Sequence, residues 1–249
     1  MDLKRARRFT NVLVNSDFSK RYAQSIYGYD HDQCKTVYLG VDPGRFNAAS
    51  SPENRQPWVI VIAKLTRFKN VDRIIEAIRL LVAGGHTSVH LHIVGTGDAE
   101  ESLQQLVDQH QLRQRVTFHG NALDRELLDL LKKSTALCLA SVDEPFGLVA
   151  IEAMACGTPV VAVDRGGPKE IVGDSGAGIL VPTGSPAEFA SAIKMILDLN
   201  VEFSTISKAA IRRAADFGWE RTVDRLEAVF EDCANRPPHL CPDPRELDS

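Results

Sequence analysis

Two glutamates lie in the stretch of this sequence whose residue types and spacing best suit ligand chemistry. Glu144 and Glu152 are eight positions apart, and the chain from residue 145 to 155 is otherwise almost wholly apolar. A helix that is apolar on nearly every face is buried, and a carboxylate in its middle is costly without hydrogen-bonding partners. Vicinal hydroxyl groups of a sugar or a ribose would be such partners, because two of them can donate to one carboxylate.

Glu144 stands just before the expected start of that helix, where free backbone N–H groups can receive an anion or a sugar oxygen. Gly147 would let a ligand approach the backbone closely. The sequence therefore predicts two carboxylates at successive depths along one ligand. A second interpretation stays open, in which Glu152 pairs with a buried Arg or Lys and Glu144 is a solvated turn residue.

A basic loop is the second candidate. Lys64 and Lys69 flank the loop that follows the apolar run 58–62, and Asn70 can cap the helix that comes next. Two cations beside a helix N-terminus suit a diphosphate, and they could stabilise a diphosphate leaving group without a metal ion. Taken alone, such a loop is more typical of a solvated basic surface.

Two glycine pairs also follow expected strands. Gly166 and Gly167 permit a tight turn against a ligand, or a turn that is purely structural. Gly95 and Gly97 resemble the start of a dinucleotide-binding fingerprint. Glu100 occupies the third glycine position of that fingerprint, which argues against a nicotinamide or flavin site.

Three other groups of polar residues are weaker candidates for a ligand or metal site. The Asp-His-Asp sequence at 30–32 has the form of a metal-diphosphate site, but a surface turn is the favoured interpretation. His119 stands at a strand end, where it could face a ligand or be packed. Cys233, His239 and Cys241 lack a fourth ligand at a familiar spacing, so we predict no bound metal.

Strand and helix patterns alternate from Trp58 onward, which predicts a Rossmann-like α/β domain: a parallel sheet with helices on both faces. Ligands bind at the carboxyl ends of the strands in such sheets, where the loops above lie. Before it, strands at 11–15 and 35–39 around a helix at 16–27 form a piece too small for its own core. We expect further strands at 58–62, 89–94, 115–118, 135–140, 159–163 and 179–181, and helices from 70, 123, 147 and 185, the last with a capping box of Ser185 and Glu188 around Pro186.

The composition of the chain excludes some function classes. It has 249 residues, 44% hydrophobic and 25% charged, with a net charge of −4, so no basic field argues for nucleic acid. No apolar run approaches the ~20 residues that span a bilayer. The basic residues among the first eight could touch an anionic membrane, although a solvated helix face is favoured. Scattered cysteines favour reduced thiols, so we expect a cytoplasmic protein, at most peripheral to the inner face of the membrane.

Together these segments resemble the C-terminal, donor-binding domain of retaining glycosyltransferases with the GT-B architecture. This is the "glycosyl transferases group 1" family, which includes glycogen and sucrose synthases and many mannosyl- and glucosyltransferases. The resemblance rests on E-P-F-G-L-V-A-I-E-A-M-A-C-G-T-P-V-V-A, which begins at Glu144. The basic loop, A-K-L-T-R-F-K-N, is further from the family's G-R-L-x-x-x-K-G, because Lys64 replaces an arginine and loses its bidentate fork. The similarity extends from about Asn11 to Phe230.

The resemblance implies a role for each site residue. Glu144 would contact the hydroxyls of the transferred sugar, Glu152 the ribose, and Lys64 and Lys69 the diphosphate of a UDP-, GDP- or ADP-sugar. The configuration at the anomeric carbon would be retained, and neither a metal nor another cofactor would be needed. The substrate-binding residues implied in this way are Glu152, Phe146, Gly147, Leu148, Val149, Gly95, Gly97, Asn121, Gly166 and Gly167.

The family has two Rossmann-like domains, with the acceptor site and part of the catalytic apparatus on the first. Residues 1–50 resemble the closing segment of that domain plus a linker, 51–235 the nucleotide-sugar-binding domain, and 236–249 look like a disordered tail. Sugar transfer would then need an N-terminal domain as partner, or self-association of this chain. The alternative is a non-catalytic module that binds a nucleotide sugar. An epimerase of the same fold is disfavoured by the paired glutamates.

Overall fold

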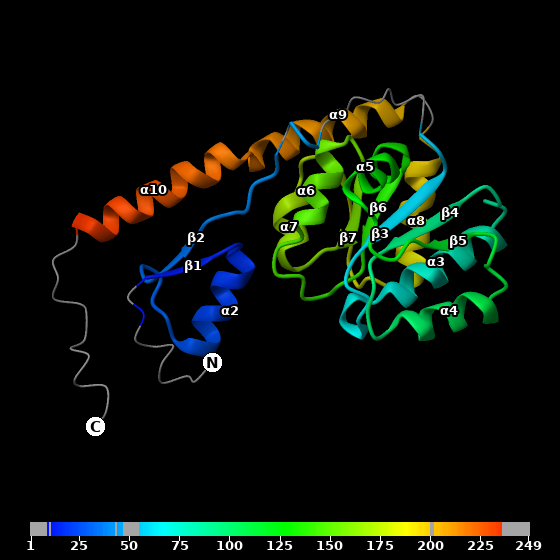
Figure 1. The fold of residues 1–249 in the computed structure, drawn as a ribbon, viewed down its shortest axis with the longest axis horizontal. Helices are drawn as coiled ribbons and strands as arrows, with labels where there is room; N and C mark the ends of the chain where they lie inside the picture. The colour runs from blue at the N-terminus through cyan, green and yellow to red at the C-terminus, as the bar shows by residue number, and fades with distance from the viewer. Residues whose placement is uncertain (1–8, 10, 43, 47–54, 200–201, 236–249) are drawn as a thin grey trace.

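The computed structural model describes residues 9, 11–42, 44–46, 55–199 and 202–235, which form a large lobe, a small lobe and a long helix that runs from the large lobe along the small one (Figure 1). Three expected features lie outside the described residues. They are the basic cluster in the first eight residues, part of the expected linker and the expected tail. The expected domain boundaries therefore remain predictions.

A parallel six-stranded sheet forms the large lobe, in the order β5-β4-β3-β6-β7-β8. Its central strands β3, β6 and β7 are apolar and mostly buried, as in other parallel sheets that helices cover on both faces. The fold is therefore the Rossmann-like α/β architecture that the alternating pattern predicts. The strands are β3 (Trp58–Ile62), β4 (His90–Val94), β5 (Val116–Phe118), β6 (Ala136–Leu139), β7 (Val160–Val163) and β8 (Gly178–Val181).

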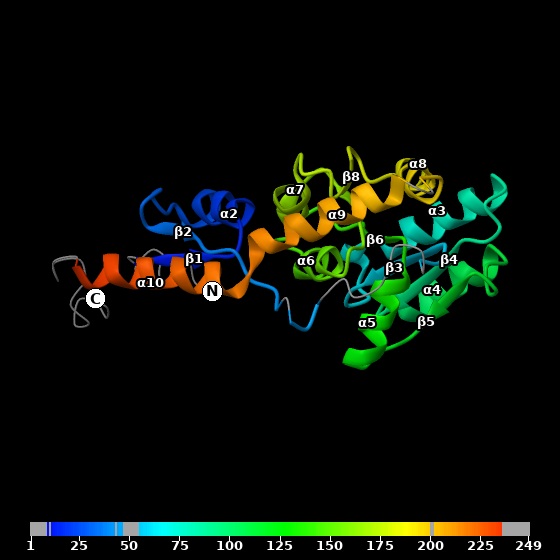
Figure 2. The same ribbon diagram turned by 90° about the horizontal axis from the view of Figure 1, so that it is seen from above.

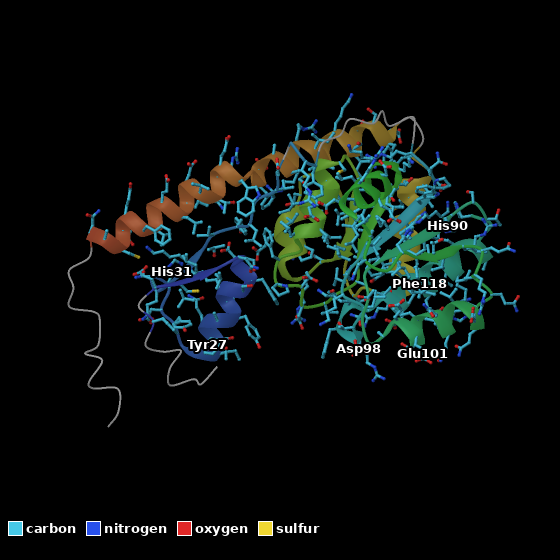
Figure 3. The ribbon with its side chains drawn as sticks, in the orientation of Figure 1. Tyr27, His31, His90, Asp98, Glu101 and Phe118 are labelled. Carbon is cyan, nitrogen blue, oxygen red and sulfur yellow. The ribbon has the colours of Figure 1, made fainter. Side chains whose placement is uncertain are left out.

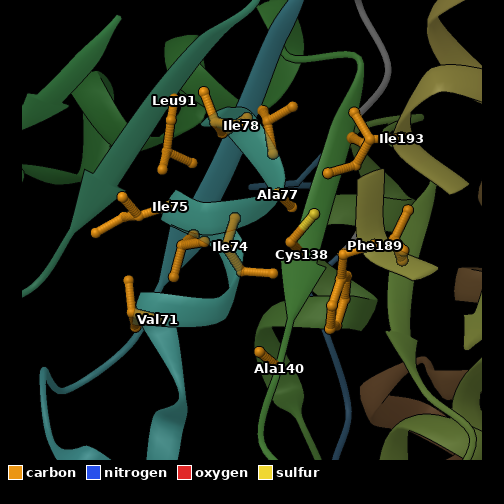
Figure 4. Packing of buried hydrophobic residues seen from close by; sticks show 14 of the residues in the cluster. Val71, Ile74, Ile75, Ala77, Ile78, Leu91, Cys138, Ala140, Phe189 and Ile193 are labelled. Carbon is orange, nitrogen blue, oxygen red and sulfur yellow. The ribbon is translucent and has the colours of Figure 1, made fainter. Parts of the chain in front are cut away.

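Helices cover both faces of this sheet (Figures 1 and 2). On one face, isoleucines of α3 pack between strands β4 and β6 and helix α8, as Ile74 and Ile78 show in Figure 4. On the other face, α5, α6 and α7 pack on the sheet, and α9 packs against α6. The helices are α3 (Val71–Ala83), α4 (Glu100–Gln109), α5 (Asp124–Lys133), α6 (Leu148–Ala155), α7 (Gly166–Val172), α8 (Pro186–Leu197) and α9 (Phe203–Ala214).

Strands β3 and β6 are neighbours although 73 residues separate the end of one from the start of the other. Val59 pairs with Ala136 and Ile60 with Leu137. The winding direction of the sheet reverses between these strands, which makes the crevice at their carboxyl ends the switch point where such folds bind ligands. The loop with Lys64 and Lys69 follows β3, and the loop with Glu144 follows β6.

The small lobe consists of β1 (Val12–Val14), α2 (Asp17–Tyr27) and β2 (Cys34–Thr36), and its two strands pair in parallel. Its own core is limited to Ala23, Tyr29 and Cys34. Helix α10 (Trp219–Asn235) extends from the large lobe along this piece (Figures 1 and 2), and an ion pair joins Lys35 to Asp232. The small lobe thus docks on other elements, as its size requires.

The two chain segments that connect the lobes touch each other. Val41 donates a backbone hydrogen bond to the carbonyl of Phe217, and a Cβ atom on Gly40 would lie 2.7 Å from the Cα of Trp219. The two connecting segments are therefore closely packed against each other.

Several local expectations need correction. The strand expected at 35–39 ends at Thr36. Asn70 does not cap α3 with its side chain, because its backbone is left-handed at φ 49°. The Gly166–Gly167 pair was expected to form a turn, and it opens helix α7 instead. The capping box is confirmed, with Ser185 and Glu188 exchanging hydrogen bonds around a proline at the first helical position.

Gly95 allows the loops after β3 and β4 to touch. Its φ is 124°, and a Cβ atom there would lie 1.9 Å from the carbonyl oxygen of Ala63. Gly95→Ala should therefore lower the free energy of unfolding by more than about 3 kcal/mol, since a backbone oxygen cannot move aside. Urea unfolding measures the change.

Gly85→Ala is the matched control. Gly85 also has a positive φ, 95°, but nothing lies within 4 Å of the Cβ position. Only backbone strain of about 1 kcal/mol is expected there. Equal losses at the two glycines would contradict the close approach at Gly95.

Candidate functional site

The predicted basic loop and the predicted acidic loop meet at the switch point. They line a cavity of about 260 Å³ at the carboxyl ends of β3 and β6. Charged groups come from both loops, and the start of α6 closes one side. The sequence-predicted residues that line it are Lys64, Lys69, Glu144, Gly147, Leu148 and Val149.

Glu144 and Lys69 form an ion pair in this cavity, with 2.6 Å between Oε2 and Nζ. The Glu144 side chain is only 14% exposed, so it is not a solvated turn residue. A charge-assisted hydrogen bond of this kind is strong, and partial burial screens it little. A ligand that carries both phosphates and hydroxyls could bind the two groups at once.

A short 3-10 turn, η2 (Arg67–Lys69), positions the lysine. Asn70 follows it and donates from its side-chain amide to the carbonyl of Ala140, at 3.0 Å. Ala140 stands directly after β6, so this bond joins the basic loop to the strand that carries Glu144. The sequence offered no signal for the contact, which joins residues 70 positions apart.

Lys64 is exposed at the mouth of the cavity, with no acidic partner among the described residues. Gly147 precedes α6 at φ 94°, and the helix has no side-chain cap. Among the described residues, nothing accepts a hydrogen bond from the amides of Gly147, Leu148 or Val149. Free amides at a helix N-terminus and an unpaired cation both favour an anion.

Glu152 lies one turn further along α6 and does not line the 260 Å³ cavity. Burial raises the pKa of its carboxyl group, and the charge of Arg45 opposes that effect. Arg45 itself pairs with Asp124, at 2.6 Å, and no hydrogen bond or ion pair reaches Glu152 among the described residues. The buried ion pair considered as the second interpretation is therefore not formed there.

The glycine pairs serve first as contacts between loops. A Cβ on Gly97 would lie 2.2 Å from the carbonyl oxygen of Leu65, and one on Gly167 would lie 2.3 Å from Phe146. A Cβ on Gly166 would lie 2.5 Å from the carbonyl oxygen of Glu144. These glycines brace the site loops against each other, and their contact with a ligand remains a prediction.

Phe146 is buried, and its ring packs against Tyr38 and Phe217 at the junction of the lobes. Only its backbone is therefore available to a ligand. Asn121 is exposed in the loop between β5 and α5, outside the cavity. Its expected contact with a base remains a prediction.

His119 is packed rather than free, in a chain of polar groups beside the sheet. Its Nδ1 lies 3.0 Å from Glu126, and its Nε2 lies 2.9 Å from Nδ1 of His92. Strands β4 and β5 place these rings together, and Figure 3 labels His90 and Phe118 on the same two strands. The Nε2 of His92 is buried and has no hydrogen-bond partner among the described residues.

Arg55, just before β3, holds the ends of two helices together. Its guanidinium donates to the carbonyls of Leu131, Ser134 and Cys156 and to the hydroxyl of Thr158. Burial lowers its pKa to about 10. It joins the carboxyl ends of α5 and α6, away from the cavity.

The described residues contain neither a cluster of metal-ligating side chains nor a membrane-spanning helix. No three side chains of the metal-ligating kinds are grouped closely enough to hold an ion. The helices within the described ranges are all too short or too polar to cross a bilayer.

Comparison with known families identifies the family of the chain. The model of the "Glycosyl transferases group 1" family matches residues 45–214, which contain both loops of the cavity. The chain belongs to this glycosyltransferase family. Its six-stranded lobe has the Rossmann-like fold of GT-B glycosyltransferase structures.

Curated members of the family include D-inositol 3-phosphate glycosyltransferases. That of Mycolicibacterium smegmatis is 31% identical over 234 residues, and that of Mycobacterium bovis is 33% identical over 237. The matches cover 88% of this chain but only 52% and 48% of those proteins. The chain thus spans about half the length of these relatives.

Solved structures share the fold. Anabaena HepE, crystallised with UDP and glucose, has a TM-score of 0.82 and 25% identity, over 92% of this chain and 65% of its own. The sucrose-phosphate synthase of Thermosynechococcus elongatus has a TM-score of 0.79 and 27% identity, over 93% of this chain and 61% of its own.

The packed histidines His92 and His119 predict that the free energy of unfolding falls in acid. Burial lowers the pKa of His92 to about 4, assisted by the charges of His90 and His119, whereas an unfolded histidine titrates near 6.5. Between these values the unfolded chain binds more protons, so stability falls as the pH falls from about 6.5 to 4, by roughly 2–3 kcal/mol. His92→Leu should flatten this slope in denaturant unfolding measured across that range.

His31→Leu serves as control, because His31 is exposed on the small lobe. Its stability profile should run parallel to that of the unsubstituted chain. If the stability profile of His92→Leu has the same slope as that of the unsubstituted chain, His92 does not titrate as described.

Proposed function

We propose that the large lobe binds a nucleoside-diphosphate sugar and serves as the donor half of a retaining glycosyltransferase. The observation that carries this is the Lys69–Glu144 pair at the switch point, beside free amides and the unpaired Lys64. Cations and amides suit the diphosphate, and the carboxylate suits sugar hydroxyls. The crystal structures of Anabaena HepE with UDP, with UDP-glucose, and with UDP and glucose support a donor of this class.

Each group then has a part in the transfer. Glu144 accepts hydrogen bonds from hydroxyls of the transferred sugar. As the bond from the anomeric carbon to the diphosphate oxygen breaks, negative charge grows on the diphosphate. Lys64, Lys69 and the amides at the start of α6 stabilise that charge, without a metal ion or another cofactor. The new bond to the acceptor oxygen forms on the same face of the sugar, which retains the configuration, and the proton of the acceptor hydroxyl passes to the departing diphosphate oxygen.

Glu152 binds the ribose in this proposal. Its carboxyl group is half-buried and lacks a hydrogen-bond donor among the described residues, so two ribose hydroxyls would supply what the protein does not. The donor would extend from the cavity past α6 toward the loops at 95–97 and 119–123, with Asn121 beside the base. Gly166 and Gly167 would support the sugar end through the Glu144 loop.

The acceptor half is also a proposal. The relatives are about twice as long as the aligned part of this chain, and the described residues of the small lobe form a sheet of two strands. We propose that an N-terminal Rossmann-like domain completes the cleft and positions the acceptor, since orientation of the reactants accounts for a large part of such rates.

Calorimetric titration with UDP, GDP and ADP tests donor binding. One of the three should bind, and Glu152→Ala should weaken it at least tenfold, because about 1.5–3 kcal/mol is lost with hydrogen bonds to a charged group. Lys69→Met should have a similar effect. Glu202→Gln, a change at an exposed position on the large lobe, should leave the affinity unchanged.

Absence of binding of all three at millimolar concentration would remove the support for a donor site. Equal weakening by Glu152→Ala and Glu202→Gln would instead place the nucleotide elsewhere. Addition of a cognate N-terminal domain then separates the alternatives: sugar transfer would identify a transferase, and unchanged donor binding without transfer a binding module.

A further inference from the structure

Glu170 reaches from the large lobe to the first turn of a helix in the small lobe. It lies on α7, and its side chain is 15% exposed. Its carboxylate accepts from the backbone amides of Asp17, at 2.9 Å, and Phe18, at 2.6 Å. These are two of the amides that a helix leaves without an internal partner, and a negative charge is favoured beside them.

Further groups converge on the same carboxylate. The hydroxyl of Tyr38 lies 3.2 Å from Oε2, and a guanidinium nitrogen of Arg21 lies 3.6 Å from Oε1. The backbone of Glu170 is fixed in turn, because Arg213 of α9 donates to its carbonyl at 2.8 Å. The contact therefore joins α2 to the frame of the large lobe through several bonds.

The contact is more than the cap that α2 needs. Ser16 already caps this helix by accepting from the amide of Ser19 at 2.9 Å. Glu188 shows the ordinary case in the same chain: it accepts from the amides of Thr183 and Ser185, a few residues away. Glu170 does the same chemistry across 152 positions and between two lobes.

We infer that Glu170 is a positioning residue, a latch that holds the small lobe in place over the candidate site. Ser16 also donates to the carbonyl of Pro145, so the held end of α2 rests on the loop that carries Glu144. A groove of about 640 Å³ lies between α2 and this loop, with Arg165 on its wall. The latch sets the width of that groove and the seating of the small lobe against the loop.

The latch is formed by groups of this chain alone, so its test does not depend on whether a donor binds. Interlobe distance is its direct readout, measured by electron spin resonance between labels on Ile26→Cys and Gln105→Cys. Both positions are on helices, one in each lobe, and Ile26 is exposed. The labelled chain also carries Cys233→Ser and Cys241→Ser, so that these two thiols do not take up label. The other three cysteines, Cys34, Cys138 and Cys156, are buried and can stay.

Glu170→Ala should broaden the distance distribution and shift it to longer values. Tyr38→Phe, which removes one hydroxyl from the latch, should give a smaller shift in the same direction. Glu188→Ala is the matched control, because it removes a carboxylate from a helix start within one lobe. It should lower the melting temperature without changing the distances.

The inference is overturned if Glu170→Ala leaves the distance distribution as Glu188→Ala leaves it. If the melting curve shows that the Glu170→Ala variant does not fold, Tyr38→Phe becomes the deciding variant. In that case an unchanged distribution for Tyr38→Phe overturns the latch, and a shift supports it.

Discussion

Parallel pairing of β3 with β6 is the constraint on which the site depends. It brings together two loops, 75 residues apart between Lys69 and Glu144, at the point where the sheet reverses its winding. The ion pair between them costs desolvation of both groups, and it is tolerable because the cavity leaves them partly open to water. The hydrogen bond from Asn70 to the carbonyl of Ala140 joins the same two segments through neutral groups, so the contact between them does not depend on the ion pair alone.

Close backbone contacts give this constraint its rigidity. Gly95 and Gly97 let the loop after β4 rest on the loop after β3, and Gly166 and Gly167 let α7 rest on the Glu144 loop. Any side chain at these positions would force backbone apart, so the loops have little freedom to rearrange. A site whose groups are held before the ligand arrives loses less entropy on binding. The glycines therefore matter through what they allow other residues to do.

Local patterns in the sequence predicted the local structure. The period of the apolar residues gave the alternating elements, the apolar surroundings of Glu152 gave a buried helix, and Ser185 with Glu188 gave a helix start. The helix at Gly166 was missed, because paired glycines are typical of turns and only packing against the Glu144 loop makes them helical here. The Lys69–Glu144 pair and the Glu170 contact lie beyond local pattern, since each joins residues far apart that only the finished fold brings together.

The two glutamates that first indicated a ligand occupy different electrostatic situations. Glu144 has a fixed cation at 2.6 Å, so a ligand there must share or replace an existing partner. Glu152 has no ion pair among the described residues: burial raises the pKa of its carboxyl group, and the opposing charge of Arg45 is itself paired with Asp124. The half-buried carboxylate of Glu152 accepts no hydrogen bond from the described residues, so a ligand hydroxyl there would add a bond without displacing a protein group. A ligand would thus exchange a partner at Glu144 and add one at Glu152.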